Sequence, residues 1–308
     1  MILIIQFLGV NSIFYCILGN NDLYLNYASF PKSVSEEYDI EFVDQPVLIV
    51  KRWRPLDHFS MIHDDLMPIY FTLKYLCMND DINECLDNDI IAFEDETKSS
   101  LYEALLPNIM YLSKYSNYFG EHQLLCFKHA TIGLESDSLW FNHGFDGSSG
   151  PIHNINFRPH LIETFRQFVI RKFKQNPNNE VEKFLFDAVI FDSDKFKNSQ
   201  EIKALLQQQF KLKVNIVDPK NKSTEELINL VSKSRVLIAF TGSVNIFSLF
   251  LQRLNCGVLE LFPFGLDETS LPHISTLVQK RGLLYRSWIN TGTNTINKII
   301  NQKKITNI

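Results

Sequence analysis

The sequence predicts an α/β fold, and the evidence is clearest in its second half. Short apolar runs that suit buried strands recur between residues 186 and 262. Segments of roughly ten to twelve residues with helical spacing of apolar side chains lie between these runs. Because strands that alternate with helices form βαβ units and a parallel sheet, we expect a Rossmann-like domain in this half.

Four strands and three helices account for this domain. The expected strands are FDAVIF (186–191), KVNIVD (213–218), RVLIAF (235–240) and GVLELF (257–262). The expected helices are SQEIKALLQQQF (199–210), STEELINLVSKS (223–234) and VNIFSLFLQRL (244–254). Ser223 and Glu226 have the spacing of a capping box at the start of the second helix.

The 308 residues are enough for two domains, and we place their boundary at residue 155, after the loop FDGSSGPI. The expected domains are therefore residues 1–155 and 156–308. In the first, VLIVKRW (47–53) is a β-branched run that predicts a strand. Residues 61–77 have the apolar spacing of a helix, and the acidic residues 78–100 are interpreted as a solvated loop and helix.

The N-terminus allows two interpretations. Residues 2–19 carry no charge, and their length is near that needed to cross a bilayer. However, no Lys or Arg precedes them, and polar residues interrupt them. The stretch NSIFYCILGNNDLYLNY (11–27) has the pattern of strand, Gly-Asn-Asn turn and strand. We favour a buried hairpin, with a membrane anchor as the alternative.

Composition excludes several classes of protein. The net charge of -5 and the pI of about 5.9 argue against a nucleic-acid binder. The five cysteines include no CxxC pair, so a zinc site is not expected. Cys77 and Cys85 flank an acidic loop and could form a disulfide in an oxidising compartment; the alternative is that all five thiols are free. Neither a GxGxxG fingerprint nor a phosphate-binding P-loop motif is present.

Three titratable residues, His63, Asp64 and Asp65, interrupt an apolar segment. Burying carboxylates costs several kcal/mol unless they are paired or hydrogen-bonded. One explanation is that they supply a general base. The other is N-capping, in which the aspartates accept hydrogen bonds from the free N–H groups at a helix start.

A second candidate site is Thr241-Gly242-Ser243, which follows a strand and opens a helix. Exposed N–H groups at such a position suit a phosphate, although an ordinary tight turn has the same pattern. Glu260 lies inside an apolar strand and needs a partner, either a ligand hydroxyl or a buried arginine. Arg52 and His129 are isolated signals, and each is more often structural than functional.

Three stretches together resemble a known family. They are VLIVKRWRPLDHFSMIHDDLMPIYFTLKYL (47–76), LLCFKHATIGLESDSLWFNHGF (124–145) and LVSKSRVLIAFTGSVNIFSLFLQRLNCGVLELFP (230–263). They are similar to the animal branch of glycosyltransferase family 61, and the resemblance extends from about residue 8 to about residue 290.

The resemblance implies a GT-B architecture, in which two Rossmann-like domains face each other across a cleft. It implies UDP-GlcNAc as donor, inversion at the sugar carbon, no metal and no other cofactor. It also implies an O-mannosylated glycoprotein acceptor such as α-dystroglycan. The implied location is the endoplasmic reticulum, with membrane contact only through an anchor at or before the N-terminus.

The resemblance also assigns roles to residues. His63, Asp64 and Asp65 would be catalytic and line the cleft, with Arg52 and His129 on the acceptor side. Thr241, Gly242, Ser243 and Glu260 would bind the donor. The family has His-Gly where this sequence has Thr241-Gly242, and it has arginines where only Lys195 and Lys197 offer positive charge. These departures leave open a catalytically impaired member that binds a sugar or a protein.

Overall fold

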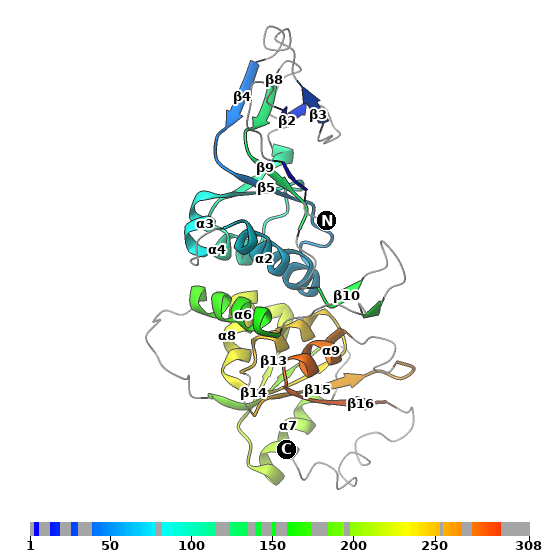
Figure 1. Ribbon diagram of the computed structural model, residues 1–308. Helices are drawn as coiled ribbons and strands as arrows, with labels where there is room; N and C mark the ends of the chain where they lie inside the picture. The colour runs from blue at the N-terminus through cyan, green and yellow to red at the C-terminus, as the bar shows by residue number, and fades with distance from the viewer. Residues whose placement is uncertain are drawn as a thin grey trace. The chain divides into compact units, whose positions relative to one another are not determined.

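The computed structural model describes the chain outside a set of short gaps and the C-terminal residues. The residues not described are 1–2, 6–12, 19–25, 30–38, 78–81, 115–122, 135–138, 143–149, 152–158, 174–183, 194–197, 253–254, 267–272 and 291–308. The chain divides into two compact units, Met1–Ser138 and Leu139–Ile308 (Figure 1). This division falls earlier than residue 155, because β10 (Phe141–Asn142) pairs with β11 (Gly150–Pro151) and β11 contacts α9 of the second unit.

The second unit is a five-stranded parallel sheet in the order β13-β12-β14-β15-β16. Its strands are β12 (Phe186–Phe191), β13 (Val214–Val217), β14 (Ser234–Phe240), β15 (Gly257–Phe262) and β16 (Leu284–Ile289). Its helices are α6 (Pro159–Phe173), α7 (Ser199–Phe210), η2 (Pro219–Asn221), α8 (Thr224–Ser232), η3 (Ser243–Phe250) and α9 (His273–Lys280). The four predicted strands and the capping box of Ser223 and Glu226 are confirmed.

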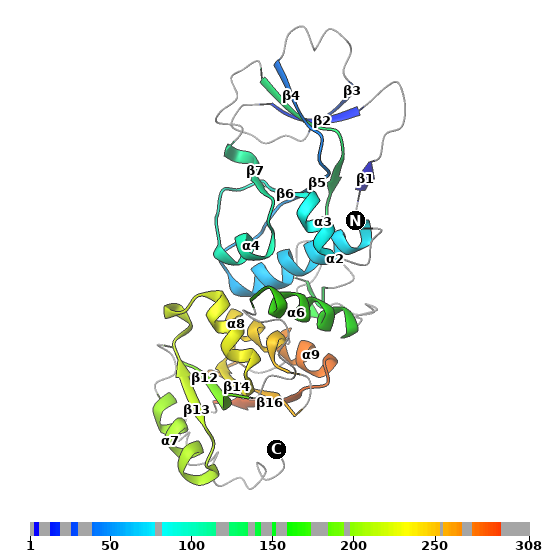
Figure 2. The same ribbon diagram turned by 90° about the vertical axis from the view of Figure 1, so that its left-hand side faces the viewer.

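Helices cover both faces of this sheet. Figures 1 and 2 show α7 on one face and α8 and α9 on the other. One face packs Ile190, Ile238 and Leu261 against Ile202 and Leu206 of α7. The switch point lies between the neighbouring strands β12 and β14. From β12 the chain continues to β13 on one side, and from β14 it continues to β15 and β16 on the other side. In such doubly wound sheets, ligands bind at this switch point beyond the carboxyl ends of the strands.

Arg281, which follows α9, connects η3 and α6 in the second unit through hydrogen bonds. It is buried, and its Nη1 and Nη2 donate to the carbonyl groups of Ser248 and Leu251 at 3.0 and 2.9 Å. Nη2 also donates to Glu163 of α6 at 3.2 Å. A single guanidinium thus holds the end of η3 and the surface of α6 together.

The first unit contains two sheets. The five-stranded sheet has the order β1-β9-β5-β6-β7, and the four-stranded sheet has the order β3-β2-β8-β4. The strands are β1 (Leu3–Ile5), β2 (Ile13–Leu18), β3 (Asn26–Ser29), β4 (Asp39–Val43), β5 (Val47–Val50), β6 (Ile90–Phe93), β7 (Ile109–Tyr111), β8 (Gln123–Phe127) and β9 (Ala130–Ile132). The helices are η1 (Ser60–Leu66), α2 (Met67–Leu76), α3 (Ile82–Asn88) and α4 (Ser100–Leu105).

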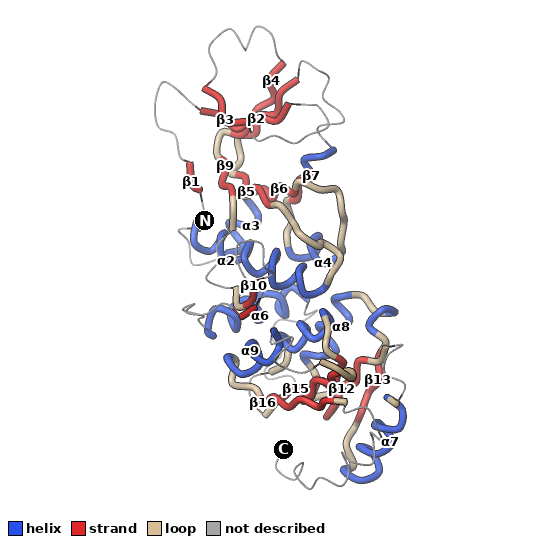
Figure 3. Tube along the Cα trace, turned by 90° about the vertical axis from the view of Figure 1, so that its right-hand side faces the viewer, coloured by secondary structure: helices blue, strands red, loops and turns tan. Residues whose placement is uncertain are grey.

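These elements of the first unit form three layers. Figure 3 shows α2, α3 and α4 on one side of β5, β6 and β7, with the four-stranded sheet on the other side. Strands β5, β6 and β7 are parallel to one another, and β1 is antiparallel to β9. The core between the sheets includes Val47, Ile49 and Ala92 from one and Leu125 and Phe127 from the other. The first unit is therefore α/β, although its sheet is mixed.

Strand β6 corrects the interpretation of residues 78–100 as a solvated loop and helix. This segment does contain α3, but Ile90–Phe93 form a buried strand at the centre of the parallel group. The strand is short, and Asp89 and Glu94 border it directly. Acidic flanks around only four apolar residues made the segment look polar as a whole.

The antiparallel pairing expected of the N-terminal hairpin is confirmed, whereas the predicted Gly-Asn-Asn turn and the burial of the strands lie outside what the structure describes. Strand β2 pairs antiparallel with β3, with Phe14 opposite Ala28. Within the described part of the chain, no helix has both the length and the apolar character needed to cross a membrane.

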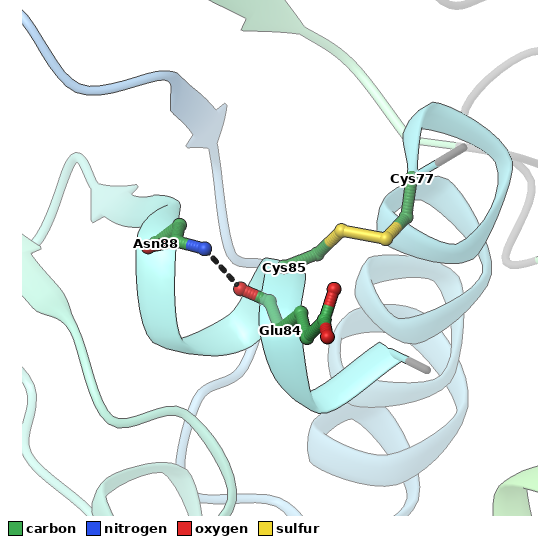
Figure 4. Close-up of a disulfide and its surroundings, with 4 residues drawn as sticks. All are labelled: Cys77, Glu84, Cys85 and Asn88. Atoms are coloured by element: carbon green, nitrogen blue, oxygen red, sulfur yellow. Dashed lines mark hydrogen bonds between the residues drawn. A yellow bond between two sulfur atoms is a disulfide. The ribbon is translucent and has the colours of Figure 1, made fainter. Parts of the chain in front are cut away.

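A disulfide joins the end of α2 to α3 (Figure 4). Cys77 follows α2 directly and is bonded to Cys85, so these two thiols are not free. The bond closes a loop with a sequence separation of 8. Cys126 is also disulfide-bonded, whereas Cys256 is a buried free cysteine.

Removing the Cys77–Cys85 bond is expected to lower the free energy of unfolding by about 2 to 3 kcal/mol, because the unfolded chain regains the freedom that so short a loop removes. Urea unfolding of Cys77→Ser measures the loss. Cys85→Ser and the double variant serve as controls. All three should lose the same amount, since each lacks the same single bond; a double variant that loses twice as much would show that the thiols act separately.

Candidate functional site

The carboxyl edge of the first unit's parallel strands carries charged and aromatic side chains. Arg52 lies two residues after β5, Asp95 lies two residues after β6, and Tyr111 ends β7. Because these strands are parallel, their ends meet at one edge of the sheet. This is the edge at which open α/β sheets bind ligands.

Arg52 is the centre of this edge. Its Nε donates to Asp95 Oδ2 at 2.8 Å, and its Nη2 donates to Asp95 Oδ1 and to the Thr97 carbonyl. The guanidinium lies 4.0 Å from the ring centroid of Phe93 and 4.8 Å from that of Tyr102. Burial alone would raise the pKa of Asp95, but hydrogen bonds from Arg52 and Thr97 outweigh it and lower this pKa. Arg52 is therefore a buried, paired cation that fixes the ends of β5 and β6.

His63, Asp64 and Asp65 lie within η1, a π-helix that continues into α2. The N–H of Met67 donates to the carbonyl of Ile62, five residues earlier. Pro68 has no N–H to give to the carbonyl of Asp64, so the ordinary helical bond is missing at this point. Single turns of π-helix inside helices are frequent at functional sites.

The structure rejects N-capping as the role of the two aspartates. Neither η1 nor α2 has a side-chain hydrogen bond at its N-cap, and both aspartates lie inside the continuous helix. The side-chain hydrogen bond near the start of this helical segment comes from Asp57 instead: its Oδ1 accepts from the N–H of Ser60 at 3.1 Å. The charged triplet therefore needs another explanation.

Asp65 faces the interior. It is 2% exposed, and its Oδ2 accepts a hydrogen bond of 2.5 Å from the hydroxyl of Tyr102 in α4. Burial, with smaller contributions from the charges of Asp64 and Asp95, raises the pKa of Asp65 to about 7, although Tyr102 and Arg52 act in the opposite direction. Burial also raises the pKa of Tyr102, so the phenol remains the donor. Tyr102 was missed from the sequence because no local pattern indicates a contact 37 residues away.

His63 and Asp64 form a second pair. The Nδ1 of His63 lies 2.5 Å from Asp64 Oδ1, and the imidazole stacks on Phe59 with 4.7 Å between ring centroids. The His63 side chain is wholly buried, whereas that of Asp64 is 15% exposed. A buried imidazole that holds a partly exposed carboxylate fixes the orientation of that carboxylate. Of the triplet, Asp64 is thus the most exposed group.

His129 does not join this cluster. It is exposed and precedes β9, which is parallel to β5, so it lies at the amino edge of the sheet. Its carbonyl accepts from the N–H of Val47, the first residue of β5, at 2.9 Å. Arg52 lies at the opposite end of that strand. The two residues expected on the acceptor side therefore lie at opposite edges of the sheet, and their role there stays a prediction.

In the second unit, Thr241, Gly242 and Ser243 follow β14 at the switch point. The N–H of Thr241 donates to the carbonyl of Leu261, and the first bond of η3 runs from Asn245 to the carbonyl of Gly242. Gly242 has φ 155°, a backbone conformation that side chains disfavour, and nothing lies within 4 Å of the position a Cβ would take. The Cβ position of Gly242, at the start of η3, thus borders open space.

Ser193 lies across the switch point from this turn, two residues after β12. Its Oγ is buried and has no hydrogen-bond partner among the described residues. The sequence offered a signal for it, because residues that follow a buried strand lie at the ligand edge of such sheets. Lys195 and Lys197, expected to supply charge here, lie outside the described residues.

Glu260 has protein partners other than the arginine considered from the sequence. It is buried in β15, and its Oε1 accepts from Asn245 Nδ2 at 3.0 Å. Its Oε2 accepts from the hydroxyl of Tyr285 in β16 at 2.7 Å. Glu260 therefore ties η3 to the sheet beneath the Gly242 turn.

The fold is α/β, each unit contains a group of parallel strands, and the carboxyl edges of these strands carry charged and hydroxyl groups. The family described as "Glycosyltransferase 61" matches residues 99–259, more than half of the chain. The chain belongs to this family.

Curated relatives share a name. They are called protein O-linked-mannose beta-1,4-N-acetylglucosaminyltransferase 2, and the identity is 26% for the Danio rerio and Homo sapiens proteins and 27% for that of Bos taurus. Each alignment covers 88% of this chain and 47% of the relative, so the chain spans about half the length of these proteins. A flavodiiron core from Synechocystis matches with a TM-score of 0.27 and 13% identity over 58% of this chain and 40% of that one, too low to bear on the fold.

Proposed function

We propose that the chain is an inverting glycosyltransferase that moves GlcNAc from UDP-GlcNAc to an O-mannosylated glycoprotein. The single observation that carries this proposal is the His63–Asp64 pair, held in a π-helix of a chain that belongs to glycosyltransferase family 61. The names of the relatives support the donor sugar and the acceptor class. The two units would form the facing domains of a GT-B enzyme.

Asp64 would act as the general base. An inverting transfer needs a group that takes the proton from the acceptor hydroxyl as that oxygen attacks the sugar carbon. Asp64 is partly exposed and aligned by His63, whereas Asp65 is turned toward Tyr102. Asp65, Tyr102 and Arg52 would then hold the helix that carries the base in position.

The donor diphosphate would bind at the switch point of the second unit. The N–H groups of Gly242, Ser243 and Val244 and the hydroxyls of Thr241 and Ser243 provide donors at the start of η3. Lys195 and Lys197 would add charge. A lysine gives a point charge without the bidentate fork of an arginine, so we expect weaker donor binding than an arginine site provides. Because protein groups already bond both Glu260 oxygens, its role would be to hold η3 rather than to bind ribose.

The compartment proposed for this reaction is the lumen of the endoplasmic reticulum. Disulfides form and persist in oxidising compartments and are rare in the cytosol. The bond between Cys77 and Cys85 supports this location, as does the bonded state of Cys126.

Gly242→Val is expected to weaken UDP binding by roughly ten- to a hundredfold, because a side chain there strains the turn and blocks close approach to its N–H groups. Calorimetric titration of UDP at moderate salt measures the change. Gly282→Val is the matched control. Gly282 also has positive φ (71°) and open space, but it precedes β16 and so lies at the amino edge of the sheet.

The control variant should bind UDP as the wild type does. Equal losses in both variants would indicate general strain, and unchanged binding in Gly242→Val would place the donor elsewhere. If folded wild-type protein bound no UDP, the chain would instead be the catalytically impaired family member, a binding protein without turnover.

A further inference from the structure

We propose that Asn221 is an N-glycosylation site, occupied by an N-linked oligosaccharide in the secretory lumen. The sequence contains a single Asn-X-Ser/Thr sequon, Asn221-Lys222-Ser223. A sequon alone is a common pattern, so the proposal rests on where the structure places these residues and on the redox state of the cysteines.

All three sequon residues are exposed. Asn221 ends the 3-10 helix η2, which connects the carboxyl end of β13 to α8. Strand β13 is one of the two edge strands of the second unit's sheet. A bulky glycan attached at this turn therefore displaces nothing from the core of the unit.

The Asn221 amide can carry a glycan and keep its present contact. Its Nδ2 donates one hydrogen bond, to Asp218 Oδ2 at 2.7 Å. A primary amide has two N–H hydrogens, and glycosylation replaces only one of them. The remaining hydrogen still serves Asp218, whose other oxygen accepts from the N–H of Lys220 at 2.9 Å.

The reaction is a transfer from a lipid-linked oligosaccharide diphosphate. A bond forms between Asn221 Nδ2 and the anomeric carbon of the first sugar, and the bond from that carbon to the lipid diphosphate breaks. The diphosphate leaves with the electron pair, and one amide proton is released. No oxidant or metal of this chain is required.

The folding of α8 also affects how the sequon is presented to the transferase. In the folded chain, the Ser223 hydroxyl accepts from the N–H of Glu226 at 3.1 Å, and Glu226 Oε2 accepts from the N–H of Ser223 at 2.9 Å. This capping box engages the sequon hydroxyl that the transferase must recognise. A chain in which α8 has not yet formed offers this hydroxyl without the capping contact and is therefore the better acceptor. The disulfides independently indicate a chain that folds in an oxidising compartment, where this modification takes place.

The test uses the full chain with a cleavable secretion signal, expressed in animal cells and digested with an N-glycosidase. Three variants separate glycosylation from helix capping. Ser223→Thr keeps both the sequon and the cap. Ser223→Asp keeps a capping oxygen but destroys the sequon, and Asn221→Gln removes the acceptor nitrogen.

Wild type and Ser223→Thr should gain mobility after digestion, and mass spectrometry should place one glycan on Asn221. Ser223→Asp and Asn221→Gln should migrate at the digested position before any treatment and show the circular dichroism of the folded protein. A folded, secreted wild type without a glycosidase-sensitive shift would overturn the proposal, as would a persisting shift in Ser223→Asp. Neither result depends on whether the chain transfers GlcNAc.

Discussion

Asp64→Asn is expected to lower the rate of GlcNAc transfer by about a hundredfold or more, because the variant lacks the carboxylate that takes the acceptor's proton. Asparagine has the same size as aspartate, and its amide oxygen still accepts from His63 Nδ1. Initial rates at saturating UDP-GlcNAc measure the loss. Melting temperature, measured on the same samples, shows whether the fold is preserved.

Asp65→Asn is the matched control for this experiment. The same isosteric change is made one residue away, on a carboxyl group that is buried against Tyr102. An asparagine oxygen still accepts from the Tyr102 hydroxyl, so transfer should remain within a few-fold of wild type. If Asp65→Asn abolished transfer while Asp64→Asn retained it, the base would be Asp65 and the assignment of roles would be wrong.

The free energy of unfolding is expected to fall by roughly 2 to 3 kcal/mol between pH 5 and pH 8 because of Asp65 alone. Burial raises the pKa of this carboxyl group from 3.8 to about 7 in the folded chain. The folded state therefore holds the proton more tightly than the unfolded state does. The resulting stability is fully present below pH 3.8 and is lost as the pH rises through about 7.

Asp65→Asn should remove this component of the pH dependence, because an amide does not ionise. Urea unfolding of wild type and variant at pH 5 and pH 8 measures the difference. Asp64→Asn is the control: it removes only one of the smaller causes of the raised pKa of Asp65, so most of the wild-type slope should remain. An unchanged slope in Asp65→Asn would contradict the placement of Asp65 as a buried carboxyl group bonded to Tyr102.

The strands of the second unit were predictable because parallel strands covered on both faces are continuous apolar runs. β12, β14 and β15 are such runs, and the small residues Thr241 and Gly242 mark the turn where one of them ends. β6 escaped prediction because it has only four residues and acidic neighbours on both sides. A strand could be predicted when its apolar run was long and its neighbours did not make the segment polar as a whole.

The candidate base could be predicted from the sequence as charge within an apolar segment. The different roles of Asp64 and Asp65 could not. Whether Asp64 or Asp65 faces solvent depends on the local winding of η1, which the missing N–H of Pro68 alters. The partners Tyr102 and Asp95 come from segments 37 and 43 residues away from the groups they bond. Contacts of that range arise when helices and strands pack in the folded chain, and they leave no local pattern.

Transfer of GlcNAc itself tests the central claim most directly. Purified chain is incubated with UDP-GlcNAc and an O-mannosyl peptide, and the product is analysed by mass spectrometry and by NMR of the new glycosidic linkage. The account predicts addition of one N-acetylhexosamine in β configuration, inverted from the donor, and its loss in Asp64→Asn. A folded chain that binds UDP yet adds no sugar to the peptide, or a product with retained configuration, would contradict it.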